Sequence, residues 1–237
     1  MSYLAVILVL GLLILVHEAG HFAAAKAVGI PVARFSIGFG RVLWSRTYGD
    51  TEYRVSLIPV GGYVMPRIKS EADYLAVPLY KRVVFSLGGP VANVALALPL
   101  FAIMNALNGN TSLYALVVGP FIQIGHVTAQ IVAAFASIFS RPDAVSGVVG
   151  IVAGGGKFVG MSLARLVLFA AIVDMNLAVL NLLPLPPLDG GKITLDALER
   201  LFPRTRRAYV PIVLVGWLFI IGLMLYATAM DVSKIAA

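Results

Sequence analysis

Residues His17-Glu18-Ala19-Gly20-His21 decide how the rest of this chain is interpreted. Positions i and i+4 share one face of an α-helix, so the two histidines of this stretch can point at a single metal ion. Glu18 follows the first histidine directly and is close enough to reach a water molecule on that ion. The H-E-x-x-H spacing is typical of zinc hydrolases, in which two imidazoles hold Zn²⁺ and the carboxylate is the general base.

The two histidines and Glu18 lie inside an apolar segment. A bare H-E-x-x-H pattern also occurs by chance, but residues 3–16 ahead of this one are almost all apolar. Ionisable side chains at membrane depth are energetically costly and are rarely present without a function. The surroundings therefore favour a zinc site with His17 and His21 as ligands and Glu18 as the catalytic group.

Composition indicates an integral membrane protein. The chain has 237 residues, of which 60% are hydrophobic and 12% are charged, whereas a soluble domain has about 25% charged residues. Several apolar runs reach the ~20 residues that a helix needs to cross a bilayer. There is no cysteine, which excludes disulfides and thiolate ligands, so a metal site must use histidines and carboxylates.

The order of its segments predicts an α-helical polytopic membrane protein with a single domain, residues 1–237. We expect four transmembrane helices, at about residues 3–28, 83–107, 160–183 and 208–230. Between the first two, residues 34–40 and 52–58 alternate with period two, which is typical of strands. We therefore predict a small membrane-associated β-hairpin or sheet at about residues 33–66, with a solvated amphipathic loop as the alternative.

Basic residues predict the membrane topology. Residues 119–139 carry polar side chains at near-helical spacing, which fits a further span or an amphipathic surface helix. Nine of the 18 Lys and Arg lie in residues 26–82 and five in residues 192–207, but only Arg141 and Lys157 lie between residues 108 and 160. The positive-inside rule places both basic regions in the cytoplasm. Both termini are then outside the cytoplasm, and residues 119–139 do not cross the membrane. Because this topology accounts for where the basic residues lie, the net charge of +7 does not indicate a nucleic-acid partner.

Asp189 is the expected third ligand. Three prolines in residues 184–187 stop the preceding helix and force an extended backbone. At membrane depth such a backbone is tolerated only where it lines a cavity or is buried in protein. Asp189 follows this rigid segment and precedes two glycines. His17 and Asp189 can reach one ion only if the span at residues 160–183 runs inward like the first, in agreement with the topology from charge.

The set of motifs resembles the site-2 protease family, intramembrane zinc metalloproteases, and is most similar to its bacterial regulator-of-sigma-E protease branch. The stretches that carry the resemblance are the H-E-x-x-H motif, Gly61-Gly62-Tyr63-Val64, Gly89-Pro90-Val91-Ala92-Asn93 and residues 181–191. The resemblance implies that His17, His21 and Asp189 bind zinc and that Glu18 is catalytic. It also implies that Gly61, Gly62 and Tyr63 belong to a membrane re-entrant β-loop that presents substrate, and that Asn176 and Asn181 hold substrate.

One departure from that branch is large. Its members usually carry one or two PDZ domains between the second and third spans, whereas only residues 108–118 precede the next apolar segment here. A PDZ domain of about 90 residues does not fit, so we do not expect such a domain between these spans to control substrate access.

The expected function is zinc-dependent cleavage of transmembrane segments, as in regulated intramembrane proteolysis. The expected substrate is a single-span membrane protein such as an anti-sigma factor, and the expected location is the inner (plasma) membrane, within the lipid bilayer. A membrane metal transporter is one alternative, although it would favour acidic residues or histidines spread along the spans. An inactive scaffold is another, and the intact Glu18 argues against it.

Overall fold

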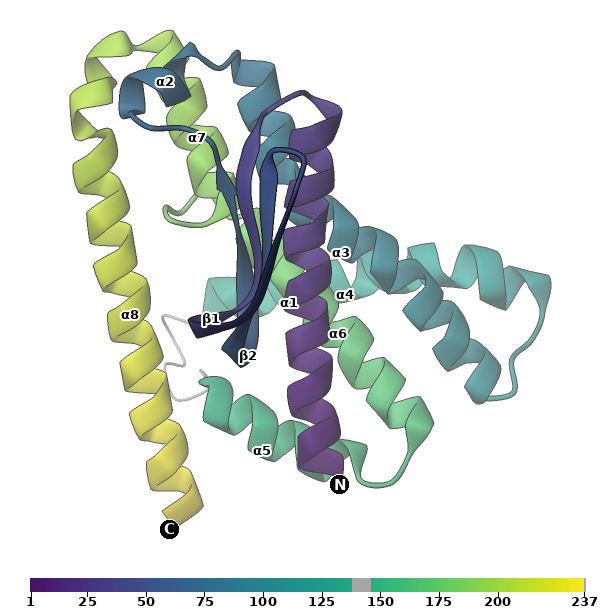
Figure 1. Ribbon diagram of the computed structural model, residues 1–237. Coiled ribbons are helices and arrows are strands. Elements are labelled where there is room, and N and C mark those ends of the chain that lie inside the picture. Colours follow the sequence, from purple (N-terminus) through teal and green to yellow (C-terminus); the bar gives the residue numbers. More distant parts are fainter. Residues whose placement is uncertain (138–145, 237) are drawn as a thin grey trace. The chain divides into compact units, whose positions relative to one another are not determined.

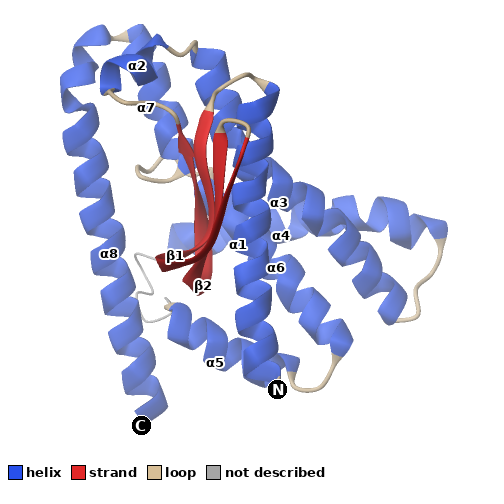
Figure 2. Cartoon of the chain, viewed as in Figure 1, coloured by secondary structure: helices blue, strands red, loops and turns tan. Residues whose placement is uncertain are grey.

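The structure, a computed structural model that describes residues 1–137 and 146–236, consists mostly of helices with one sheet (Figures 1 and 2). The elements in chain order are α1 (Ser2–Ala27), β1 (Val32–Tyr48), β2 (Thr51–Pro66), α2 (Glu71–Ala76), α3 (Leu79–Leu107), a π-helical turn η1 (Tyr114–Val118), α4 (Gly119–Ser137), α5 (Val148–Val159), α6 (Leu163–Asn181), α7 (Asp189–Leu201), a 3-10 turn η3 (Pro203–Thr205) and α8 (Arg206–Ala236). The helical class and the sheet between the first two long helices are as predicted.

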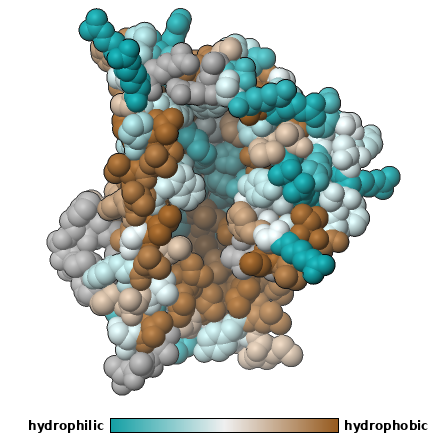
Figure 3. All heavy atoms as spheres, turned by 60° about the vertical axis from the view of Figure 1, so that its left-hand side comes forward, coloured by the Kyte–Doolittle hydropathy of each residue, from teal (hydrophilic) through white to brown (hydrophobic). Residues whose placement is uncertain are grey.

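Five helices have the length and apolar composition to cross a membrane. They are Ser2–Ala27, Leu79–Leu107, Tyr114–Ser137, Leu163–Asn181 and Arg207–Lys234. Apolar residues also cover much of the face seen in Figure 3. The number of four spans is therefore not confirmed, because Tyr114–Ser137, which contains most of the segment expected not to cross, also qualifies. The last two residues of that expected segment, 138 and 139, lie outside the described residues.

The chain divides into two compact units. Unit 1 comprises Met1–Val9, Val94–Val179 and Ile212–Ala237, and unit 2 comprises Leu10–Asn93 and Leu180–Pro211. The H-E-x-x-H motif, the sheet and Asp189 all belong to unit 2. The candidate metal site can therefore be described within one unit.

The core of unit 1 joins three helices. Its buried members are Ala97, Phe101 and Met104 of α3, Ile131 of α4, and Ala171 and Met175 of α6. Asn105 of α3 and Gln123 of α4 also exchange two hydrogen bonds, of 3.0 and 3.2 Å, through their side-chain amides. Polar pairs of this kind hold neighbouring helices together in lipid, where apolar contact alone gives little preference for a partner.

In unit 2, helices α1 and α3 cross at two glycines. A side chain on Gly20 would collide with the backbone of Gly88, and one on Gly88 would meet the side chain of Ala24. This close approach sets the motif of α1 beside α3. Beyond the crossing, at the C-terminal end of α1, Ala25, Ile30 and Val32 form a small core against which Val64 and Phe85 pack, so the same core anchors the sheet to both helices.

The sheet has an unusual register, because the first half of β1 is paired on both sides. The second half of β1 forms a hairpin with the start of β2, with Trp44 opposite Val55, while Phe35 lies opposite both Tyr53 and Val64. Within the described chain, residues 62–66 are paired only with the first half of β1. This segment is therefore an edge of the sheet, with backbone groups open on its other side.

Candidate metal centre

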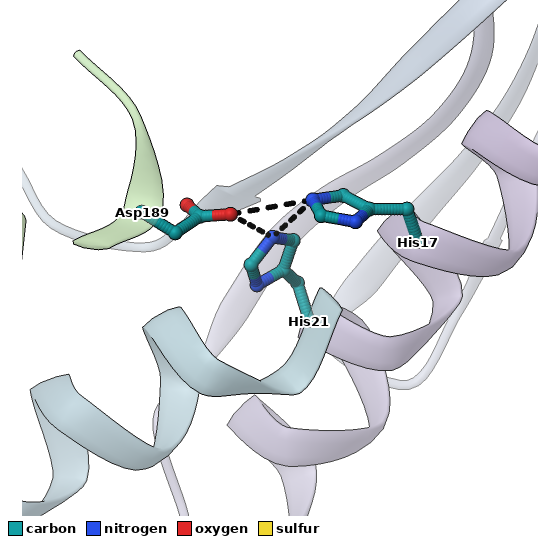
Figure 4. A group of neighbouring side chains, drawn as sticks. All are labelled: His17, His21 and Asp189. Atoms are coloured by element: carbon teal, nitrogen blue, oxygen red, sulfur yellow. Dashed lines mark hydrogen bonds and ion pairs between the residues drawn. The ribbon is translucent and has the colours of Figure 1, made fainter. Parts of the chain in front are cut away.

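Three predicted ligands converge on one point. His17 and His21 project from α1, and Asp189 begins α7 (Figure 4). The two Nε2 atoms are 3.2 Å apart, and Asp189 Oδ2 lies 3.2 Å from the Nε2 of His17 and 3.1 Å from that of His21. All three side chains are buried. The i, i+4 spacing therefore brings both imidazoles to one carboxylate from a segment 168 residues away.

These distances fit a tetrahedral zinc ion. Two ligand atoms bound to zinc at 2.0–2.1 Å and separated by the tetrahedral angle are about 3.3–3.4 Å apart. The three separations in the structure are 3.1 to 3.2 Å, slightly shorter than this value. Two imidazoles and one carboxylate supply three ligands, which leaves the fourth position of a catalytic zinc site open.

The tautomer of His21 gives independent support for a cation. Its Nδ1 is 2.8 Å from the carbonyl oxygen of Phe85, and because a carbonyl only accepts, Nδ1 carries the proton. The backbone N–H of Gly89 is also 3.3 Å from Nδ1, but the shorter contact with Phe85 decides. In the neutral ring Nε2 then has a lone pair facing the carboxylate oxygen of Asp189, and a cation between them removes the repulsion.

Asp189 is held by the proline-rich segment and by a lysine. Side chains on Gly190 or Gly191 would collide with the backbone at Leu182 or Leu185, which explains the two glycines after the aspartate. Lys192 Nζ donates to Asp189 Oδ1 at 2.9 Å and leaves Oδ2 to the histidines. Burial alone would raise the pKa of Asp189, but the cationic Lys192 beside it lowers this pKa, and the carboxylate stays ionised.

Gly89 also lines the site, which the sequence did not indicate. A Cβ atom at this position would lie 2.5 Å from the Nε2 atoms of both histidines. In the sequence, Gly88-Gly89-Pro90 is explained equally well by close packing of helices. That explanation holds for Gly88 at the crossing with α1, but Gly89 leaves space where the metal ligands meet.

Glu18 lies next to the edge of the sheet. It is partly buried, and a Cβ atom on Gly62 would be 3.4 Å from its Cγ atom. The other two predicted β-loop residues contact the sheet itself. Gly61, with φ +98°, lies against the ring of Phe39, and the hydroxyl of Tyr63 accepts a 3.4 Å hydrogen bond from Arg34. The structure thus brings Gly62 to the candidate catalytic residue.

The two predicted substrate-binding asparagines lie at different places on α6. Asn176 belongs to unit 1, and its side-chain amide donates to the Ile172 carbonyl of its own helix at 2.8 Å. Asn181 is the last residue of α6, belongs to unit 2 and is partly buried. Their role in binding substrate stays a prediction.

Comparison with known proteins identifies the family. Residues 5–224 match the profile of peptidase family M50. The chain belongs to peptidase family M50. This is the site-2 protease family, so the resemblance drawn from the motifs is confirmed, and with it the zinc dependence of the family.

Similar proteins carry protease names. A candidate zinc metalloprotease of Campylobacter jejuni is 25% identical over 355 aligned positions, which cover 99% of this M50 chain and 94% of the relative. A candidate zinc metalloprotease of Chlamydia pneumoniae is 38% identical over 125 residues, 46% of this chain and 20% of the relative. The regulator of sigma-E protease RseP of Salmonella typhimurium is 45% identical over 106 residues, 40% of this chain and 23% of RseP. The match thus spans about a fifth of the length of the last two.

The M50 chain is shorter than its full-length relative in at least one place. The alignment with the Campylobacter jejuni protein has 355 positions, 118 more than the residues of this chain. In the structure, the connection between α3 and η1 is residues 108–113. The short connection expected after the second predicted span is therefore present, and a PDZ domain does not fit there.

Proposed function

We propose that this chain is a zinc-dependent intramembrane endopeptidase that cleaves transmembrane segments of other membrane proteins. One observation carries the proposal: three buried ligand atoms, each within 3.2 Å of the other two, lie beside a glutamate inside a helix of membrane-spanning length. Membership of family M50 and the protease names of similar proteins support it.

In the mechanism, His17, His21 and Asp189 would hold Zn²⁺, which would polarise the scissile carbonyl and make a water molecule more acidic. Glu18 takes the proton from the attacking water and passes it to the leaving nitrogen. Lys192 keeps Asp189 oriented through its second oxygen. The burial of the three ligands limits access of bulk water to the site.

Substrate binding must expose the backbone of a transmembrane helix. A transmembrane helix satisfies its carbonyls within itself, so the scissile segment has to unwind before attack. The edge segment at residues 62–66 lies beside Glu18 and has backbone groups open on one side. An unwound substrate can add to this edge as a further strand, and the amides of Asn176 and Asn181 are the candidate partners for its remaining backbone groups.

The proposed substrate is a single-span membrane protein of the anti-sigma factor class in the inner membrane. The name of the RseP relative, a regulator of sigma-E protease, supports this class. The five apolar helices support a multi-pass location.

Replacing Glu18 tests the mechanism. Glu18→Gln keeps the size of the side chain but cannot accept a proton, so we expect cleavage of a reconstituted single-span substrate to fall by about 10²- to 10⁴-fold, with one zinc per chain retained. His21→Ala is the matched control and should lose both cleavage and zinc. Near-normal turnover by zinc-loaded Glu18→Gln would refute the assigned mechanism.

A further inference from the structure

Asn93 contacts the metal site from its outer side. It lies on α3 in unit 2 with a fully buried side chain. Its Nδ2 atom is 3.3 Å from Nδ1 of His17, the ring nitrogen that faces away from the other two ligands. Within residues 1–137 and 146–236, its Oδ1 atom is buried with no hydrogen-bond partner. An orphaned amide oxygen in this position needs an explanation.

The orientation of this amide decides the tautomer of His17. If Nδ2 donates to Nδ1, then Nδ1 is unprotonated and the proton of the neutral ring is on Nε2, which faces Asp189. A protonated Nε2 cannot bind zinc. If the amide is rotated by 180°, Oδ1 takes the place of Nδ2 and accepts from a protonated Nδ1, which leaves the Nε2 lone pair free for the metal.

We propose that Asn93 is a positioning residue that accepts a hydrogen bond from His17 Nδ1 through its side-chain oxygen and so directs the Nε2 lone pair of His17 to the zinc ion. In the rotated amide Oδ1 contacts His17 Nδ1 and Nδ2 takes the buried position that Oδ1 has now, so the support for this orientation is the Nε2 lone pair of His17 that a metal ion requires. The proposal rests on the ligand set of the proposed function.

The other two ligands show the same arrangement. His21 donates its Nδ1 proton to the Phe85 carbonyl, and Asp189 accepts from Lys192 through Oδ1. Each of these ligands has its second polar atom bonded to a neighbour and presents one remaining atom to the centre. With Asn93 in this role, all three ligands are fixed in this way, and such outer contacts raise metal affinity.

Two substitutions separate an acceptor role from simple packing. Asn93→Leu fills the space without an acceptor, and we expect it to weaken zinc binding by about 10- to 100-fold, measured by competition with a chromophoric chelator. Asn93→Asp supplies only acceptor oxygens, and should bind zinc at least as tightly as the natural chain. Asn105→Leu is the control, because this partly buried amide of α3 bonds to Ala115 and Gln123 instead. It should leave the zinc affinity unchanged.

Nuclear magnetic resonance tests the proposal first on the natural chain and then on Asn93→Leu. The protein has three histidines, and the third, His126, is exposed on α4 and serves as an internal reference. With ¹⁵N-labelled histidine, the zinc-loaded protein should show His17 protonated at Nδ1 and bound to metal through Nε2. Asn93→Leu should broaden or shift the Nδ1 signal of His17 more than that of His21.

The inference would be overturned by zinc binding by His17 through Nδ1, and also by equal losses of affinity in Asn93→Leu and Asn93→Asp. Failure of the proposed function looks different, since the natural chain would then bind no zinc through His17 at all. A natural chain that binds zinc and cleaves substrate, together with a fully zinc-competent Asn93→Leu, would remove only the role of Asn93.

Discussion

At the scale of single residues, the site depends on what surrounds each ligand as much as on the ligands. His17, His21 and Asp189 could be predicted, because the first two follow helical spacing and the third follows a rigid proline segment. Gly89 and Asn93 could not, since a small residue and an amide on a membrane helix are equally well explained by packing. Only the positions of the imidazoles show that one leaves space for the site and the other contacts His17.

Gly89→Ala should disrupt the metal site. The added methyl group would lie 2.5 Å from both Nε2 atoms, so the imidazoles must move apart and zinc should be lost or bound far more weakly. Gly154→Ala on α5 is the matched control, because a Cβ atom there meets nothing within 4 Å and should change stability by no more than about 1 kcal/mol. Metal analysis of both purified variants checks this, and full zinc in Gly89→Ala would contradict it.

At the scale of elements, α7 is fixed to α3 by a buried ion pair two turns from the metal site. Arg82 donates to Asp196 at 2.9 Å, and Tyr74 of α2 donates to the other oxygen of Asp196 at 2.8 Å. Burial raises the pKa of Asp196, although Tyr74 and Arg82 oppose this shift. Asp189 and Asp196 are seven residues apart and share a face of α7, so the ion pair helps to set the position of the ligand.

Removing one partner of this pair should destabilise the protein. Arg82→Met leaves the Asp196 carboxylate buried without its cationic partner, and we expect a loss of roughly 3–5 kcal/mol in the free energy of unfolding. The double variant Arg82→Met/Asp196→Leu removes both charges and should recover much of this loss. Unfolding in mixed micelles measures both. A double variant as unstable as the single one would show that the loss comes from packing rather than from the lone charge.

The pairing of the strands in the sheet could not be predicted from the sequence. Alternation of residues predicts strands near residues 33–66, but it does not tell which strands pair. The double pairing of Phe35 and the open edge at residues 62–66 depend on contacts between segments that are distant in the chain. For the same reason, composition alone identifies Tyr114–Ser137 as long and apolar but does not tell whether it crosses.

The open edge can be tested by cross-linking, because the chain has no cysteine of its own. In the Glu18→Gln background, Met65→Cys on the edge segment should form a disulfide with a single cysteine placed near the scissile bond of the substrate. Leu43→Cys, exposed in the hairpin half of β1, is the matched control and should react much less. Equal cross-linking of the two positions would argue against strand addition at residues 62–66.

At the scale of the whole chain, contacts within unit 1 bear on topology. Asp231 near the end of α8 accepts from the backbone N–H groups of Gly147 and Gly150, at 2.8 and 2.7 Å. A side chain on Gly156 would meet the ring of Tyr3. Both chain ends therefore lie near α5, as Figure 1 shows. We therefore predict an even number of crossings between Tyr3 and Gly147, with α1 and α3 crossing the membrane and α4 not crossing it.

Cysteine labelling in intact cells tests this topology. Ser146→Cys and Ser233→Cys should react with a membrane-impermeant thiol reagent from outside, because α5 and the end of α8 lie on the side of the chain ends. Lys69→Cys, in the basic region expected in the cytoplasm, is the control and should react only after the cells are opened. Labelling of Ser146→Cys only in opened cells would mean that α4 crosses the membrane.

Metal ligands on both α1 and α7 also affect the entropy of the unfolded chain. A zinc ion shared by His17 and Asp189 is a crosslink between positions 172 residues apart, a loop that includes most of unit 1 by sequence. A covalent crosslink of that span would lower the entropy of a free unfolded chain by an amount equivalent to about 5 kcal/mol. A membrane already confines the chain, so the effect here is smaller, but its sign is the same. The ion that serves the chemistry thus also restrains how far the helices can separate.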